Sequence, residues 1–199
     1  VAIMTSAWVK DVTGLAVATA ISIPFLLISG LPKGHHNFVK NATATVFATI
    51  YLPFLAGFLI VLAKPDDGLA RVMTFVVVVG CNDTFGYIFG VLLGKHKLAP
   101  AISPKKTWEG LIGSLIFSIL GGGLMLSLLF DKHWLLGAAI GVAAVFTATC
   151  GDLIESAIKR DLDLKDMGAI LPGHGGMLDR LDSVLLSAPI IWAILTLVG

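Results

Sequence analysis

Six apolar segments, each close to the length needed to cross a bilayer, constrain the fold of this 199-residue chain more than any other feature. A membrane-spanning helix needs about 20 mostly apolar residues. The segments cover residues 12–31, 41–63, 72–93, 109–130, 134–151 and 183–199. We therefore expect an all-α fold, in which a polytopic transmembrane helical bundle carries its polar residues on the connecting loops.

The composition favours lipid as the surrounding solvent. Hydrophobic residues make up 56% of the chain and charged residues 14%, and the mean hydropathy is +0.92. A soluble domain carries about 25% charged residues, so this chain has too few to cover a globule in water. The formal net charge of +1 gives no indication of nucleic acid binding.

Lysine and arginine residues are divided unevenly between the two sides of such a bundle. With six spans, alternate loops share a side. One side carries Lys33, Lys40, Lys95, Lys97, Lys105, Lys106, Lys159, Arg160, Lys165 and Arg180, and the other carries Lys10, Lys64, Arg71 and Lys132. Because cytoplasmic loops are enriched in these residues, we expect the first side to face the cytoplasm.

The loop between the fifth and the last span concentrates charge in an otherwise apolar chain. It begins with four polar residues at helical spacing: Asp152, Glu155, Ser156 and Lys159. If the helix continues past the membrane surface, they form one polar stripe with Arg160 beside it. The alternative is a solvated helix end with i,i+4 pairing. The position of Asp152 favours a functional role. A carboxylate directly after an apolar run costs free energy unless it is paired or bound to a cation.

The same loop continues with Lys165 and Asp166 and then with a Pro-Gly-His-Gly-Gly turn around His174. The glycines of this turn, Gly175 and Gly176 among them, allow the backbone to approach a ligand closely. Successive amides in such a turn can form an anion-binding nest. A flexible hairpin between two helices is the alternative.

Acidic residues open the last span. Asp179 and Asp182 lie three residues apart and share a helix face, with Arg180 between them. Complementing the helix dipole is one explanation for them. Asp152 and Asp179, however, each lie where a span meets the same surface, and two carboxylates beside Lys and Arg suit Mg²⁺ that bridges a nucleotide phosphate. An interhelical salt-bridge network is the alternative.

Asp83 lies in the middle of the third span. An ionisable residue at such a depth indicates a functional site by default. A polar helix–helix contact through Asn82 or Thr84 explains the segment equally well. A helix break near Gly80 or Gly86 would instead bring Asp83 nearer the surface.

Residues 103–109, with the sequence SPKKTWE, precede the fourth span. Pro104 is typical of a helix start. The hydroxyl and ammonium groups that could clamp a polyphosphate belong to Ser103, Lys105, Lys106 and Thr107. Ordinary positive-inside topology with a tryptophan interface anchor is the alternative.

Residues Ser156–Asp182, SAIKRDLDLKDMGAILPGHGGMLDRLD, resemble the signature of the bacterial-type phosphatidate cytidylyltransferases, or CDP-diacylglycerol synthases. That signature has Ser, Lys-Arg, Lys-Asp, a Pro-x-His-Gly-Gly turn and Asp-Arg-x-Asp, and every position is filled here. Residues Cys81–Gly110 and the pair Gly151-Asp152 also resemble the family. The resemblance covers roughly the C-terminal 120 residues.

The resemblance implies a Mg²⁺-dependent nucleotidyltransferase of phospholipid synthesis, which converts CTP and phosphatidic acid to CDP-diacylglycerol and diphosphate. It implies that Asp152 and Asp179 bind the metal, that a monovalent cation such as K⁺ accompanies it, and that the protein is a homodimer. It also implies the bacterial inner membrane, with the active site on the cytoplasmic side. Residues 72–199 would form the catalytic transmembrane domain and residues 1–71 N-terminal transmembrane helices. Because the sequence opens at Val1 without Met, we expect further helices upstream.

In this reaction two anions approach each other, so charge neutralisation should matter more than proton transfer. The expected phosphate contacts are Lys105, Lys106, Lys159, Arg160, Lys165, Arg180 and the amides of Gly175 and Gly176. His174 would orient a phosphate or act as an acid. Asp166 and Asp182 would position cations, and Asp83 would complete the polar site.

Two other functions stay open from the sequence. A CTP-dependent lipid kinase of the polyprenol or phytol type would also use Mg²⁺ and basic loops, but it would release CDP. A membrane transporter would use Asp83 within its span, beside glycine-rich helices. The gathering of charge on one membrane face, rather than along a path through the middle, disfavours the transporter.

Overall fold

The computed structural model describes residues 1–164 and 181–198. Five of its helices are long and apolar enough to cross a membrane: Ala2–Gly30, Phe38–Ala63, Gly68–Leu93, Trp108–Leu129 and Trp134–Asp161. Only 17% to 44% of each apolar stretch is buried within the protein, which leaves the remainder for lipid. The expected all-α, polytopic fold is therefore confirmed, and the chain is an integral membrane protein.

The sixth expected span differs in length. Within the described residues it is α7, Asp182–Val198, an apolar helix of 17 residues that falls just short of the other five. Pro189 lies inside it, where it removes one backbone hydrogen bond. The described part of the chain thus contains five long spans and this shorter helix.

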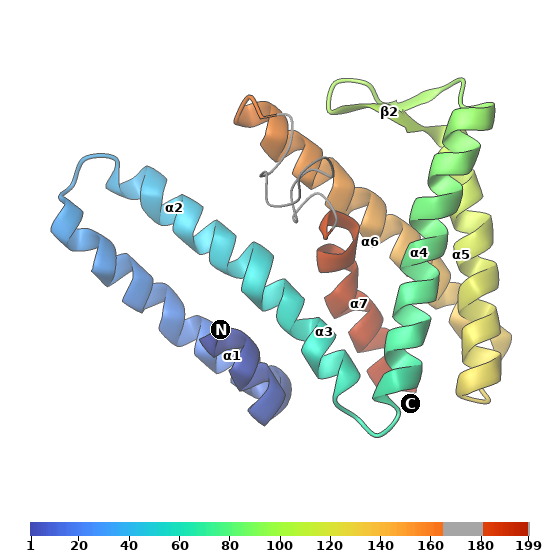
Figure 1. Cartoon of the computed structure of the whole chain (residues 1–199), viewed down its shortest axis with the longest axis horizontal. Coiled ribbons are helices and arrows are strands. Elements are labelled where there is room, and N and C mark those ends of the chain that lie inside the picture. Colours follow the sequence, from blue (N-terminus) through green and yellow to red (C-terminus); the bar gives the residue numbers. More distant parts are fainter. Residues whose placement is uncertain (165–180, 199) are drawn as a thin grey trace, which may run out of the picture. The chain divides into compact units, whose positions relative to one another are not determined.

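The chain divides into two compact units, Val1–Gly68 and Leu69–Gly199. In the first, α1 (Ala2–Gly30) kinks at Lys10 and Asp11, where Asp11 adopts φ 55°. An L residue is strained in that region. An ion pair of 2.6 Å between Asp11 and Lys64 accompanies the kink. The kink lies directly before the first apolar segment expected from the sequence, which begins at residue 12 (Figure 1).

The second span of this unit is interrupted in its middle. It consists of α2 (Phe38–Thr49), a π-helical turn η2 (Ile50–Phe54) and α3 (Leu55–Ala63), and a short 3₁₀ turn η1 (Leu31–Lys33) precedes it. Pro53 lies in the π turn. Since proline has no N–H and crowds the preceding turn, the local widening accommodates it without ending the span.

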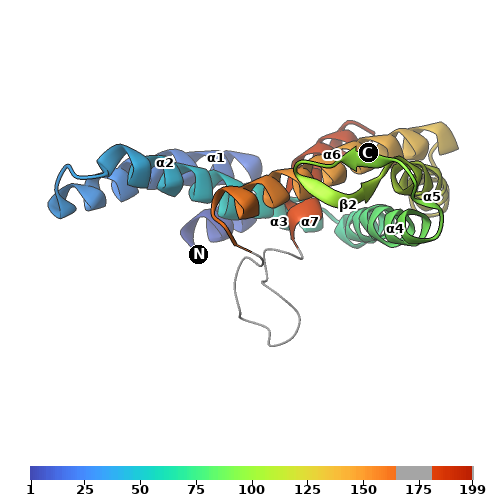
Figure 2. The same ribbon diagram turned by 90° about the horizontal axis from the view of Figure 1, so that it is seen from above.

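In the second unit, α4 (Gly68–Leu93) leads into an antiparallel hairpin of β1 (Lys97–Ala99) and β2 (Ser103–Thr107), and α5 (Trp108–Leu129) follows at once. Figures 1 and 2 show the hairpin at the end of the bundle where α4 ends and α5 begins. Glu109 of α5 holds the chain before β1, because it accepts hydrogen bonds from the backbone N–H of His96 and contacts its Nδ1 at 2.6 Å.

Pro104, expected near a helix start, lies within β2, and α5 begins directly after that strand at Trp108. The start of α5 is set by Thr107, whose hydroxyl accepts a hydrogen bond from the N–H of Gly110. Such a cap satisfies one of the donors that the first helical turn leaves without a partner.

Small residues bring the remaining helices of this unit close together. A Cβ on Gly122 of α5 would lie 2.2 Å from the carbonyl oxygen of Gly137 in α6 (Trp134–Asp161). A Cβ on Gly151 of α6 would lie 2.3 Å from the carbonyl oxygen of Asp182 in α7. Close backbone approach of this kind is typical of helix packing in membranes. It brings the start of α7 against α6 beside Asp152.

Candidate active site

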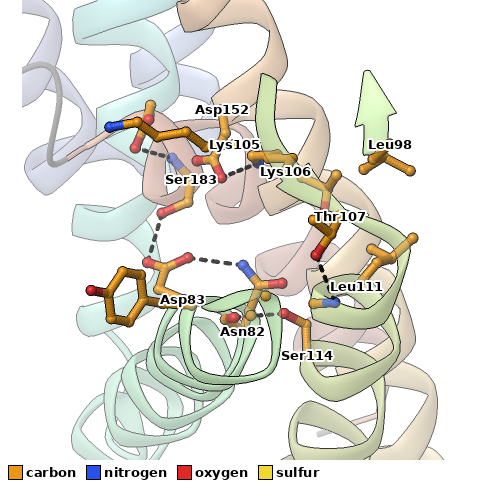
Figure 3. A pocket seen from close by; sticks show the side chains of 16 residues that line it. Asn82, Asp83, Leu98, Lys105, Lys106, Thr107, Leu111, Ser114, Asp152 and Ser183 are labelled. Carbon is orange, nitrogen blue, oxygen red and sulfur yellow. Dashed lines mark hydrogen bonds and ion pairs between the residues drawn. The ribbon is translucent and has the colours of Figure 1, made fainter. Parts of the chain in front are cut away.

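A pocket of about 390 Å³ lies within the second unit, at the end of the bundle that carries the hairpin. Every element of this unit except β1 contributes a polar side chain to its wall. The polar lining residues are Asn82, Asp83 and Tyr87 of α4, Lys105, Lys106 and Thr107 of β2, Ser114 of α5, Thr149 and Asp152 of α6, and Asp182 and Ser183 of α7. Figure 3 labels most of these side chains, and dashed lines in it join Asp83 to Asn82 and Ser183, and Lys106 to Asp152.

The hairpin supplies the positive charge of the pocket. Lys106 forms an ion pair with Asp152, and each of the two side chains is 24% exposed. Lys105 also lines the pocket. Neighbouring residues of a regular strand point their side chains to opposite faces. The pairing of this hairpin is irregular between Lys97 and Ala99, and both lysines of β2 line the pocket.

Asp83 is held by two hydrogen bonds. Nδ2 of Asn82 donates to its Oδ1 at 2.8 Å, and the hydroxyl of Ser183 donates to its Oδ2 at 3.1 Å. Ser114 in turn donates to the carbonyl oxygen of Asn82 at 2.6 Å (Figure 3). Helix α4 is continuous through Gly80 and Gly86, so the helix break considered from the sequence does not occur. Asp83 therefore both lines the pocket and takes part in a polar helix–helix contact.

Asp152 and Asp182 bring two carboxylates together where α6 meets α7. Asp182 is half-buried, and its carboxylate lies close enough to that of Asp152 for their negative charges to repel each other. Two adjacent carboxylates favour a bound cation, because a positive charge removes their mutual repulsion. Among the described residues no group of three or more His, Cys, Asp or Glu side chains could hold a metal alone. Two carboxylates suffice for Mg²⁺ when substrate phosphates and water complete its coordination.

Helix α6 continues through Asp161, so the polar residues after Asp152 are helical. Glu155 is only 2% exposed, and its Oε2 lies 2.6 Å from Nζ of Lys159. The i,i+4 pair considered from the sequence thus forms, but on a buried carboxylate rather than on a solvated helix end. Nε of Arg160 donates to the carbonyl oxygen of Ile102, which ties the end of α6 to the turn of the hairpin.

The predicted site residues fall into three groups. Asp83, Lys105, Lys106, Thr107, Asp152 and Asp182 line the pocket. Three more, which belong to the same unit but do not line the pocket, are Ser103, Lys159 and Arg160. Lys165, Asp166, His174, Gly175, Gly176, Asp179 and Arg180 lie outside the described residues.

Sequence reasoning missed two buried serines among the residues that line the pocket. Ser114 and Ser183 are small and polar within apolar helices, and both are almost fully buried. Serines of this kind usually donate a hydrogen bond to the carbonyl oxygen of the preceding turn, so they give no indication of a site. The available signal was the position of Ser183 directly after Asp182.

Comparison with known proteins identifies the family of the chain. The profile described as "Cytidylyltransferase family" matches residues 1–198. The phosphatidate cytidylyltransferase of Mycobacterium leprae (strain TN) is 47% identical over 161 residues, which cover 81% of this chain and 52% of that protein. That of Staphylococcus haemolyticus (strain JCSC1435) is 40% identical over 184 residues, which cover 90% of this chain and 69% of that protein. The chain spans about half the length of the mycobacterial relatives that it matches. A profile match over almost every residue, with bacterial relatives at this identity, confirms the resemblance, and the chain belongs to the cytidylyltransferase family.

Proposed function

We propose that this protein transfers a cytidylyl group from CTP to phosphatidic acid, which gives CDP-diacylglycerol and diphosphate. The proposal rests on the pocket, in which Lys105 and Lys106 face a pair of carboxylates, Asp152 and Asp182. It rests also on the membership of this chain in the cytidylyltransferase family. Both substrates are phosphates, one soluble and one lipid-borne, and the pocket lies at one end of a bundle of apolar helices.

The proposed reaction needs little general acid or base catalysis. The phosphate of phosphatidic acid is itself a nucleophile at neutral pH, and it attacks the α-phosphorus of CTP while diphosphate leaves in line. The barrier comes from bringing two anions together, so preorganised positive charge contributes most. Lys105 and Lys106 supply that charge from the hairpin, and Ser103, at the start of the same strand, is a further candidate contact for phosphate. Thr107 would help through its cap, which fixes the orientation of β2 relative to α5.

Mg²⁺ fits the donor set of the pocket. Asp152 would hold it together with Asp179, as the family resemblance implies, and Asp182 lies close enough to Asp152 to assist. When bound, the metal would neutralise the triphosphate and orient it for in-line attack. A second, monovalent cation such as K⁺ belongs to the same proposal and rests on the family resemblance alone.

The signature loop completes the proposed site. Lys165 and Arg180 would contact phosphate oxygens, and the amides of Gly175 and Gly176 would receive an oxyanion. His174 would orient a phosphate or protonate a leaving oxygen. Asp166 would position neighbouring cations. Lys159 and Arg160 would act from the last turns of α6, where Lys159 pairs with Glu155 and Arg160 bonds to the hairpin.

The proposed setting is the inner membrane of a bacterium, with the pocket on the cytoplasmic side. The lysines of the hairpin lie at the same end of the second unit as Lys159 and Arg160 of α6, as the positive-inside rule favours. A membrane lipid would then enter from the bilayer and CTP from the cytoplasm. Assembly into a homodimer is proposed by analogy with the family.

The test is conversion of labelled CTP and phosphatidic acid by purified protein in detergent. We expect CDP-diacylglycerol and diphosphate in equal amounts, and only with a divalent metal. Release of CDP with a phosphorylated lipid would indicate the lipid kinase instead. Ion or solute flux in liposomes without any consumption of CTP would indicate a transporter. Turnover without Mg²⁺ or Mn²⁺ would contradict the proposed mechanism.

A further inference from the structure

Ser183, the second residue of α7, bonds to two carboxylates of the pocket at once. Its hydroxyl donates to Oδ2 of Asp83 at 3.1 Å, and its backbone N–H donates to Oδ1 of Asp182 at 2.8 Å. The residue is 2% exposed, so water does not compete for these donors. Ser183 lies 100 positions from Asp83 and directly after the signature that ends at Asp182.

We infer that Ser183 is a positioning residue, which fixes the direction of the Asp83 carboxylate toward the pocket during the transfer proposed above, on which this inference rests. It acts through Asp83 and does not itself touch a substrate. Its role differs from that of the signature residues, because it supplies a hydrogen bond to an acid rather than a charge to a phosphate.

The need for such a residue follows from the charges around the pocket. Asp83, Asp152 and Asp182 are three carboxylates that line the same pocket, and like charges repel each other. Hydrogen-bond donors on both oxygens of a carboxylate restrict its rotation more than a donor on one oxygen does. Asp83 has one donor on each oxygen, Asn82 on Oδ1 and Ser183 on Oδ2, so its plane is fixed.

The two donors come from different helices. Asn82 belongs to α4, as Asp83 does, whereas Ser183 belongs to α7. The bond from Ser183 therefore also ties the start of α7, where Asp182 meets Asp152, to the middle of α4. Loss of the hydroxyl should release the Asp83 carboxylate while the backbone bond to Asp182 remains.

Ser187 offers a matched control on the same helix. It lies one turn further along α7, is fully buried, and donates to the carbonyl oxygen of Ser183 at 2.7 Å. Its hydroxyl also accepts from Thr147 at 3.0 Å, and it does not line the pocket. Ser183→Ala and Ser187→Ala thus remove the same group from equally buried positions, but only the first faces Asp83.

The first experiment compares these two variants by kcat/KM for CTP at saturating phosphatidic acid. A hydrogen bond to a charged group corresponds to a loss of about 10- to 100-fold, which we expect for Ser183→Ala. For Ser187→Ala we expect a change of less than about threefold, because the pocket is untouched. Thermal unfolding of both variants shows whether each is folded. Equal losses in the two variants would overturn the inference.

The second experiment is a double-mutant cycle with Asp83→Asn. If Ser183 acts through Asp83, the variant that carries both changes should be no more than about threefold worse than Asp83→Asn alone. If the two losses multiply, Ser183 acts independently of Asp83, and the inference is wrong. A purely structural role for Ser183 predicts multiplication, so the cycle separates positioning from folding.

A binding measurement separates this inference from the proposed function. The rise in Tm on adding CTP with Mg²⁺ reports binding without turnover. We expect a smaller rise for Ser183→Ala than for Ser187→Ala. Wild-type protein that makes no CDP-diacylglycerol would contradict the proposed function. Wild-type activity, together with equal rates and equal Tm rises in the two serine variants, would contradict only the role of Ser183.

Discussion

Lys106 of β2 and Asp152 of α6 form an ion pair across the pocket, although 46 positions separate them in the chain. The pair joins the hairpin to the helix that carries the signature residues. A phosphate that enters the pocket must compete with Asp152 for the Lys106 ammonium. The Lys106 ammonium is therefore a group that a phosphate in the pocket would meet.

Replacement of Lys106 should weaken the use of CTP. For Lys106→Gln we expect kcat/KM for CTP to fall by about 10- to 100-fold, because a charge-assisted contact to phosphate is lost. Lys97→Gln is the matched control, since Lys97 is an exposed lysine of β1 in the same hairpin and does not line the pocket. Steady-state rates with varied CTP measure both. Equal losses would mean that only the overall charge of the hairpin matters.

Replacement of Asp152 should abolish the metal-dependent reaction. For Asp152→Asn we expect kcat to fall by about 100-fold or more, because the neutral amide neither holds Mg²⁺ well nor pairs with Lys106. Asp161→Asn, at the exposed end of the same helix, should stay close to wild type. Rates measured across a range of Mg²⁺ concentrations make the comparison. Near-full turnover by Asp152→Asn would remove this residue from the metal site.

Thr107 is expected to contribute to stability through its cap on α5. Thr107→Val keeps the shape of the side chain but removes the acceptor for the N–H of Gly110. Loss of such a cap destabilises a protein by about 1 kcal/mol. Thr107→Ser retains the hydroxyl and should retain most of the stability. Thermal unfolding in detergent measures the difference, and a Thr107→Val variant as stable as Thr107→Ser would show that the cap contributes little.

The spans and the family could be predicted from the sequence, whereas the pocket could not. Apolar length determines which segments cross a membrane, and the signature is local in sequence. The contacts that build the pocket are not local: Asp83 meets Ser183 across 100 positions, and Lys106 meets Asp152 across 46. Helix packing alone decides which of several polar residues meet.

The hairpin escaped prediction for a different reason. Its strands have three and five residues and lie in a charged, proline-containing loop, so neither alternation nor β-propensity indicates them. Its stability comes from contacts with the helices around it, through His96 and Glu109 and through Arg160 and Ile102. Lys105 and Lys106 could therefore be named as phosphate ligands from the sequence, but the strand that carries them could not.

The contact between Gly151 and Asp182 gives the sharpest structural prediction. A Cβ on Gly151 would lie 2.3 Å from the carbonyl oxygen of Asp182, and neither backbone can yield without moving α7 away from α6. Gly151→Ala should therefore lower Tm by several degrees, about 1–3 kcal/mol of overpacking, and should displace Asp182 from Asp152. Activity should fall further than the loss of stability explains.

Gly80→Ala is the matched control, because nothing lies within 4 Å of a Cβ at that position of α4 and alanine favours a helix. Thermal unfolding and CDP-diacylglycerol formation measure the two variants side by side. A Gly151→Ala protein with the Tm and the rate of Gly80→Ala would show that α6 and α7 are not packed as closely as described, and that the pairing of Asp152 with Asp182 does not depend on this glycine.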